Sequence, residues 1–177
     1  KYPCRFIPEI PRWAIQKYLT GVQNGSVFDP FAGSGTTLLE SVINDFGAYG
    51  TEIDNIAKLI IKVKTTPFTK DKLDEIANEF NRIITNIDTS QKPQRLPGIN
   101  NLNHWFTEDA IVKLSGIKMN IDSIDDKDIR DFFKVCFVSI IKRVSNADDV
   151  SPKPYVSNKV IKNPPETIKE FSSTFTK

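Results

Sequence analysis

A short segment rich in small and polar residues has the composition of a ligand-binding loop. Residues 29–37 read Asp-Pro-Phe-Ala-Gly-Ser-Gly-Thr-Thr, and residues 26–28, just before them, are typical of a short buried strand. Because ligands of open α/β sheets bind outside the carboxyl ends of the strands, we expect Asp29 to lie at a ligand. Gly33 and Gly35 lack a Cβ, so the chain can turn tightly there and let a ligand touch the main chain.

An acidic residue follows the second expected strand, 17 residues after Gly35 in the sequence. This strand is predicted over residues 48–53, and it ends in Glu52-Ile53-Asp54. A carboxylate in this place can accept hydrogen bonds from both hydroxyls of a ribose. The helix that follows the loop begins at Thr36 and Thr37, and its free N–H groups would face the same crevice. The arrangement fits a cofactor that contains adenosine.

The spacing of the glycines separates the classes of such cofactors. A dinucleotide fingerprint requires Gly-x-Gly-x-x-Gly, but Leu38 occupies the third glycine position. A P-loop requires a lysine directly after its last glycine, and none follows Gly35. Asp29 would repel a pyrophosphate and suits a ligand with a cationic amine, such as the methionine part of S-adenosylmethionine. A nucleotide-dependent enzyme of another class, for instance a dehydrogenase, stays the alternative.

The elements around the loop indicate the opening of a doubly wound α/β fold. A short helix over residues 12–20 precedes the first strand, and an apolar stripe from Leu38 to Ile43 predicts a helix after the loop. A further helix is expected over residues 56–63, with Asp54 or Asn55 as its cap. The order is strand, glycine-rich loop, helix, strand, acid, helix. Only two strands are evident, so we expect a partial sheet.

Beyond residue 66 the apolar pattern becomes helical. Residues 73–84 place their apolar side chains on one helix face, and Thr107 is expected to cap another helix. Ser123 opens a segment that resembles a capping box before a strongly amphipathic helix over residues 126–144. We therefore expect three regions: an α/β half over residues 1–66, a helical region over 67–145, and a loop or tail over 146–177.

Residues 29–37 resemble motif I of the DNA amino-methyltransferases, whose usual form is DPFxGSGTT. Residues 49–54, Tyr-Gly-Thr-Glu-Ile-Asp, are similar to motif II of this family, which supplies the ribose-binding acid and an apolar residue against adenine. Residues 6–10, Phe-Ile-Pro-Glu-Ile, resemble motif X, which packs over the methionine end of the cofactor. The resemblance covers roughly residues 1–66. It implies a Rossmann-like class I methyltransferase fold with an α-helical insert or extension, and S-adenosyl-L-methionine as cofactor.

The same resemblance implies a set of cofactor-binding residues from the three motifs. Motif X would supply Phe6, Ile7 and Pro8; motif I would supply Asp29, Pro30, Phe31, Ala32, Gly33, Ser34, Gly35, Thr36 and Thr37; and motif II would supply Glu52, Ile53 and Asp54. Phe31 has a second interpretation as a simple core residue.

The catalytic motif of this family, (D/N/S)PP(Y/F), has no good copy in the sequence. Asn163-Pro164-Pro165 is the nearest candidate, but Glu166 stands where the family has an aromatic residue that stacks on the extruded base. We leave the catalytic residues unassigned. We expect the chain to be a fragment or a split subunit whose tail leads to a missing catalytic half, able to bind cofactor but not to methylate.

For the complete enzyme, the resemblance implies methyl transfer to the exocyclic amine of adenine (N6) or cytosine (N4) in double-stranded DNA, within a restriction-modification system. Two alternatives stay open. One is a non-catalytic subunit that binds cofactor and works with a second chain carrying the catalytic motif. The other is a methyltransferase that acts on RNA or a small molecule. The target base and the recognition sequence follow from no pattern in these residues.

The composition, 39% hydrophobic and 26% charged, is that of a soluble globular protein. No run approaches the roughly 18 apolar residues of a membrane span, and the first residues show no signal peptide. Cys4, Cys136 and the single His104 lack the spacing of a metal site, so we expect no metal and a cytoplasmic chain with reduced thiols. The net charge of +2 is too small to indicate nucleic acid by itself.

Overall fold

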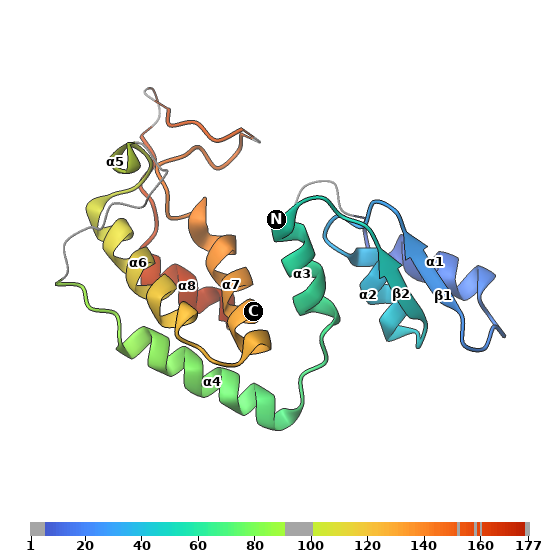
Figure 1. Cartoon of the computed structure of the whole chain (residues 1–177). Helices are drawn as coiled ribbons and strands as arrows, with labels where there is room; N and C mark the ends of the chain where they lie inside the picture. Colours follow the sequence, from blue (N-terminus) through green and yellow to red (C-terminus); the bar gives the residue numbers. More distant parts are fainter. Residues whose placement is uncertain (1–5, 91–100, 152, 158, 160, 176–177) are drawn as a thin grey trace. The chain divides into compact units, whose positions relative to one another are not determined.

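The computed structural model describes residues 6–90, 101–151, 153–157, 159 and 161–175 (Figure 1). The chain divides into two compact units, Lys1–Phe68 and Thr69–Lys177, which we call the α/β unit and the helical unit. Cys4 and residues 91–100 lie outside the described residues. Within these described ranges, no helix has the length and apolar character needed to cross a membrane.

The α/β unit is built on a parallel sheet of two strands, β1 (Ser26–Asp29) and β2 (Gly47–Gly50). Their register pairs Ser26 with Gly47 and Asp29 with Gly50. The strands are connected by α2 (Thr36–Ile43), which packs against both of them. Two more helices, α1 (Glu9–Tyr18) and α3 (Asn55–Thr65), pack on α2 (Figure 1). The unit is therefore a small α/β layer with the order expected from the sequence.

Among the described residues of the α/β unit, helices cover one face of this sheet. A Cβ added to Gly50 would lie 3.0 Å from the side chain of Leu38 on α2, so this face of β2 looks toward α2. Side chains alternate along a strand, so Phe28 and its partner Tyr49 point to the other face. They are 63% and 65% exposed. The expectation of a buried strand at residues 26–28 is wrong, because Ser26 and Phe28 are exposed and Val27 is only half-buried. Within the α/β unit, a two-stranded sheet with helices on one side leaves its second face open.

The helical unit contains α4 (Lys70–Thr85), α5 (Leu102–Trp105), α6 (Glu108–Asp122), α7 (Lys127–Ile141) and α8 (Thr167–Phe175). Figure 1 shows α4, α6, α7 and α8 gathered into one bundle, and α6 packs against each of the other three. Its interior is lined by aliphatic and aromatic side chains that are at most 2% exposed: Ile76, Ile83, Ile117, Ile121, Ile129, Phe133, Ile140, Val144 and Phe171. Within α4, α6 and α7 these positions follow helical spacing, which is why the sequence pattern predicts those three helices.

Capping residues explain where several helices begin. The Asp54 carboxylate accepts a 2.8 Å hydrogen bond from the Ala57 amide, which confirms Asp54 as the cap of α3. Thr107 caps α6 as expected, by accepting a hydrogen bond from the Ala110 amide. The expected cap at Ser123 is wrong, because Ser123 ends α6 and Asp126 begins α7. Asp126 accepts from two amides, which a carboxylate reaches more readily than a serine hydroxyl.

The tail expected to be loop ends in a helix, α8. Glu166 stands just before it, and its carboxylate accepts a 2.6 Å hydrogen bond from the Lys169 amide. Phe171 is 1% exposed, and the rings of Phe80 and Phe175 stack with centroids 4.3 Å apart. The loop prediction is therefore wrong for residues 167–175. The helix has only nine residues and few apolar ones, so its stability comes from packing against the bundle.

Candidate cofactor site

The loop between β1 and α2 is shaped by a short-range hydrogen bond and two glycines. The Asp29 carboxylate accepts a 3.0 Å hydrogen bond from the Phe31 amide, an Asx turn that folds the chain as it leaves β1. Gly33 and Gly35 have φ angles of +52° and +75°, a backbone region that residues with a Cβ rarely adopt. A Cβ on Gly35 would also lie only 2.8 Å from Cγ1 of Ile61 on α3. The loop conformation thus depends on glycine, most clearly at Gly35.

The end of β2 is joined to this loop through Thr51. The Thr51 amide donates to the Asp29 carbonyl, and the Ala32 amide donates to the Thr51 carbonyl, both at 3.0 Å. The Thr51 hydroxyl donates to the carbonyl of Pro30. Thr51 was not among the residues expected from the sequence. The parallel register would have indicated it, because Asp29 pairs with Gly50 and so Thr51 comes next to the start of the loop.

A cavity of about 100 Å³ opens at the carboxyl end of β1. Among the described residues, its lining consists of eight, all of them expected at the cofactor: Phe6, Asp29, Phe31, Ala32, Gly33, Ser34, Thr36 and Thr37. Segments that lie more than 20 residues apart in the sequence therefore meet at one place. The carboxyl edge of a parallel sheet is where open α/β folds bind their ligands.

Two side chains in this cavity stand out by their exposure. Phe31 is 89% exposed, so the interpretation of Phe31 as a core residue is wrong. Ser34 is only 3% exposed, and its hydroxyl has no hydrogen-bond partner among the described residues. A buried polar group without a partner costs free energy, and a ligand with a polar atom would relieve that cost.

Glu52 lines a second cavity of about 400 Å³, together with Leu38, Gly50, Thr51, Lys58, Ile61 and Lys62. One oxygen of the Glu52 carboxylate accepts hydrogen bonds from the amides of Ile53 and Asp54, at 2.7 and 2.9 Å. A carboxylate has lone pairs on both oxygens, so further acceptor capacity stays on Glu52. Ile53 is 93% exposed. An apolar side chain this open can pack on a flat ligand.

The other expected residues lie around these cavities without being part of either lining. Ile7 is 61% exposed, and Pro8 stands directly before α1. Pro30 accepts the hydrogen bond from Thr51, and Gly35 is the residue from which α2 begins. Asp54 uses its carboxylate to cap α3. The geometry thus gives Pro30, Gly35 and Asp54 structural parts in shaping the loop and the neighbouring helix.

The weak catalytic candidate Asn163-Pro164-Pro165 belongs to the helical unit. These residues lead into Glu166, which caps α8. Its Oε1 forms an ion pair with Nζ of Lys113 on α6, at 2.7 Å. Burial raises the pKa of Glu166, but hydrogen bonds from Lys113 and from the Lys169 and Ile168 amides outweigh it and leave the pKa lowered. A carboxylate tied down in this way holds the start of a helix, and it offers none of the stacking surface of an aromatic residue.

Comparison with known proteins finds two methyltransferases whose sequences are similar to this chain. The chain is 29% identical over 151 residues to the type II methyltransferase M.MvaI of Kocuria varians, a match that covers 82% of this chain and 33% of that protein. It is 25% identical over 156 residues to the type II methyltransferase M.MjaII of Methanocaldococcus jannaschii, covering 84% of this chain and 28% of the relative. No protein-family model matches the chain, and no solved structure does. The chain thus spans about a third of the length of the curated relatives it matches, and over that third it is similar to type II methyltransferases.

Proposed function

We propose that the α/β unit binds S-adenosyl-L-methionine and that the chain is the cofactor-binding portion of a DNA methyltransferase. The observation that carries this proposal is the cavity at the end of β1, where eight residues expected at such a cofactor form one lining. The similarity to two type II methyltransferases supports it independently.

In this proposal each part of the site recognises one part of the cofactor. The Asp29 carboxylate attracts the ammonium group of the methionine end, and the glycine-rich main chain lets that end approach closely. The buried Ser34 hydroxyl gains the partner it lacks. Glu52 accepts hydrogen bonds from the ribose hydroxyls, and Ile53 packs on adenine. When bound, the cofactor supplies a methyl group on a sulfonium, which is activated for transfer to an amine.

Methyl transfer is proposed for a complete enzyme that contains this chain. Its substrate would be the exocyclic amine of adenine (N6) or cytosine (N4) in double-stranded DNA, in the cytoplasm, as part of a restriction-modification system. The orientation of the amine would come from a second chain or segment that carries the catalytic motif. We therefore expect the isolated chain to bind cofactor without methylating. Transfer of labelled methyl groups to duplex DNA by the chain alone, lost on Asn163→Ala, would contradict this.

Calorimetric titration with S-adenosylhomocysteine tests the binding proposal directly. The variant Asp29→Asn keeps an oxygen that can accept from the Phe31 amide, but it removes the negative charge. We expect Asp29→Asn to weaken binding about tenfold or more, since hydrogen bonds to charged groups contribute about 1.5–3 kcal/mol. Asp45→Asn is the matched control, because Asp45 is an exposed acid of the same unit outside both cavity linings.

Two results would overturn the proposal. Binding of NAD without binding of S-adenosylhomocysteine would indicate a nucleotide-dependent enzyme of another class. Equal affinities of the Asp29→Asn and Asp45→Asn variants would show that Asp29 does not face the ligand. If cofactor binds but no partner chain restores methylation of duplex DNA, the alternatives are a non-catalytic subunit or a methyltransferase for RNA or a small molecule.

A further inference from the structure

A two-pronged ion pair joins α1 to α2 within the α/β unit. Nε of Arg12 lies 2.9 Å from Oε2 of Glu40, and Nη2 of Arg12 lies 3.0 Å from Oε1. The two residues are 28 positions apart in the sequence. Glu40 is 3% exposed, whereas the Arg12 side chain is 47% exposed. The arginine therefore reaches from the surface onto a buried carboxylate and satisfies both of its oxygens.

The geometry of this pair restricts orientation as well as distance. Two parallel N–H···O bonds fit only when the planar guanidinium and the carboxylate lie in register. The buried residues of α1 itself, Pro11 and Ile15, are apolar. Apolar packing tolerates substitution and small shifts, while a bidentate pair does not. The pair thus determines how α1 is turned and placed along α2.

Both helices carry parts of the small cavity at their N-terminal ends. On α2, Thr36 and Thr37 line the cavity; in front of α1, Phe6 lines it. The residues between Phe6 and the helix are tied to its first turn, because the Ile10 amide donates to the Ile7 carbonyl and the Arg12 amide donates to the Pro8 carbonyl. A change in the placement of α1 is therefore transmitted to Phe6.

We propose that Arg12 and Glu40 are positioning residues that hold Phe6 over the cofactor-binding loop, so that cofactor affinity depends on the pair through Phe6. This inference rests on the proposed function. Neither residue lines the cavity, and neither touches the cofactor in this scheme. Their effect is to keep an apolar side chain that is 57% exposed in place before the ligand arrives. Such preorganisation raises affinity by lowering the cost of ordering on binding.

A double-mutant cycle separates positioning from simple stabilisation. The substitutions are Phe6→Ala, the apolar replacement Arg12→Met with Glu40→Leu, and all three together. Replacing a buried ion pair by apolar residues of similar volume often preserves stability, so the double variant should keep its melting temperature. We expect Phe6→Ala to weaken binding of S-adenosylhomocysteine about tenfold in the wild-type background and about twofold or less in the double variant, since residues that act together couple.

The helical unit offers a control pair of the same residue types. Nη1 of Arg143 lies 2.8 Å from Oε1 of Glu170, with side-chain exposures of 54% and 9%, a single charged contact without the two-pronged geometry. Arg143→Met with Glu170→Leu should leave the tenfold effect of Phe6→Ala unchanged. If the Arg12→Met, Glu40→Leu variant does not fold, Arg12→Lys replaces it, because lysine keeps the charge but loses the fork.

If Phe6→Ala weakens binding of S-adenosylhomocysteine by the same factor in the wild type and in the Arg12→Met, Glu40→Leu variant, the inference is overturned. A wild-type chain that binds no S-adenosylhomocysteine would instead overturn the proposed function. In that case hydrogen exchange of the ligand-free protein decides the positioning role. The Ile10 amide, which donates to the Ile7 carbonyl, should exchange faster in the Arg12→Met, Glu40→Leu variant than in the wild type, and equal exchange rates would overturn the inference.

Discussion

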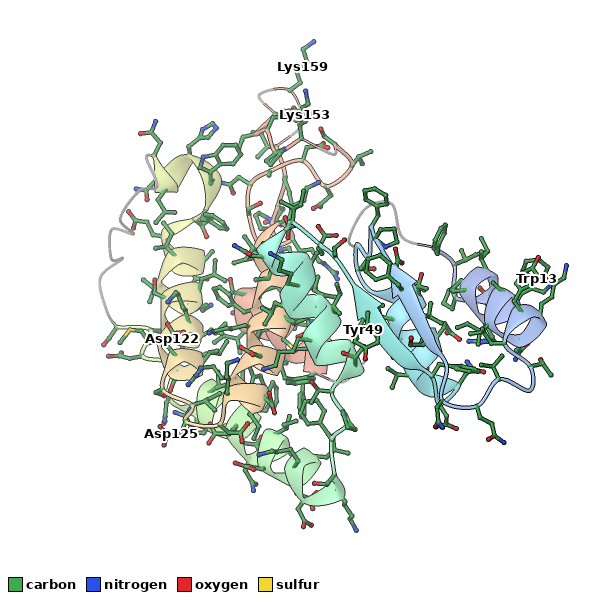
Figure 2. All side chains as sticks on the ribbon, turned by 45° about the vertical axis from the view of Figure 1, so that its right-hand side comes forward. Trp13, Tyr49, Asp122, Asp125, Lys153 and Lys159 are labelled. Carbon is green, nitrogen blue, oxygen red and sulfur yellow. The ribbon has the colours of Figure 1, made fainter. Side chains whose placement is uncertain are left out.

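The α/β unit and the helical unit bury their aromatic side chains to very different extents. In the helical unit, Phe133 and Phe171 are at most 1% exposed and lie within a cluster of phenylalanine rings. In the α/β unit, Phe28 and Tyr49 sit opposite each other on the sheet and are more than 60% exposed. Figure 2 shows Tyr49 on β2 and Trp13 on α1 with their rings outside the ribbon. Most other large apolar side chains exposed in the described residues also belong to this unit.

The difference follows from how each kind of element can cover itself. Helices with one apolar stripe close on a common interior, and α4, α6, α7 and α8 do so. A parallel sheet is normally buried on both faces, whereas within the described part of the α/β unit the helices cover one face of β1 and β2. The unit that holds the candidate site is thus shaped by glycines and main-chain hydrogen bonds, and the other unit by its core.

The largest expected effect contrasts a buried and an exposed phenylalanine. Phe133→Ala should lower the free energy of unfolding of the helical unit by about 3–5 kcal/mol, because it removes a fully buried ring and leaves a cavity. Phe28→Ala should change the stability by less than about 0.5 kcal/mol, because that ring is already exposed. Urea denaturation followed by circular dichroism measures both. If the two variants lose comparable stability, the sheet face that carries Phe28 is covered, and the contrast between the two units does not hold.

An intermediate effect tests whether main-chain conformation shapes the α/β unit. Gly35→Ala should destabilise it by about 1–3 kcal/mol, because the new Cβ meets Ile61 at 2.8 Å in addition to the strained φ. Gly21→Ala is the control, since Gly21 has φ +81° but no atom within 4 Å of the added Cβ. It should cost about 1 kcal/mol from the φ angle alone. Thermal melting of the two variants compares them, and equal losses would remove the close packing of Gly35 as a cause.

The smallest effect concerns a polar contact at the edge of the helical core. A hydrogen bond from Lys72, followed by one from the Ile129 amide, lowers the pKa of Asp126. The folded state therefore binds this proton less readily, so the charge stabilises the fold above the ordinary aspartate pKa of about 3.9 and stops doing so as the pH falls through the lowered pKa.

Asp126→Asn isolates that charge, because asparagine caps a helix about as well as aspartate. The variant should be slightly less stable than the wild type at neutral pH, and the difference should vanish at strongly acidic pH. The loss should be small because the pair lies at the surface with both side chains partly exposed, at 28% and 32%. Melting temperatures across a pH series check this, and a difference that does not vary with pH would contradict the electrostatic cause.

Local patterns allowed much of the fold to be predicted from the sequence. The segments before the glycine-rich loop and before Glu52 located β1 and β2, although β2 ends at Gly50 and not at residue 53. Helical spacing located α4, α6 and α7, and side-chain chemistry identified the caps Asp54 and Thr107. The last helix, α8, was missed because a short segment with several serines and threonines carries little helical signal of its own. Its phenylalanines become informative only when Phe80 and Phe133 lie next to them.

For the candidate site, the sequence by itself determined the types of residues in the loop from Asp29 to Thr37. Their spacing excludes a dinucleotide fingerprint and a P-loop without any structure, because those motifs require glycine or lysine at particular steps along one chain segment. Tertiary structure decided which distant segments meet the loop. Phe6 lines the cavity at the loop, and the main chain of Thr51 forms hydrogen bonds with Asp29 and Ala32. Arg12 forms an ion pair with Glu40. Alone, an arginine and a glutamate 28 residues apart look like solvated surface, and only the packing of α1 on α2 brings the arginine onto a buried carboxylate.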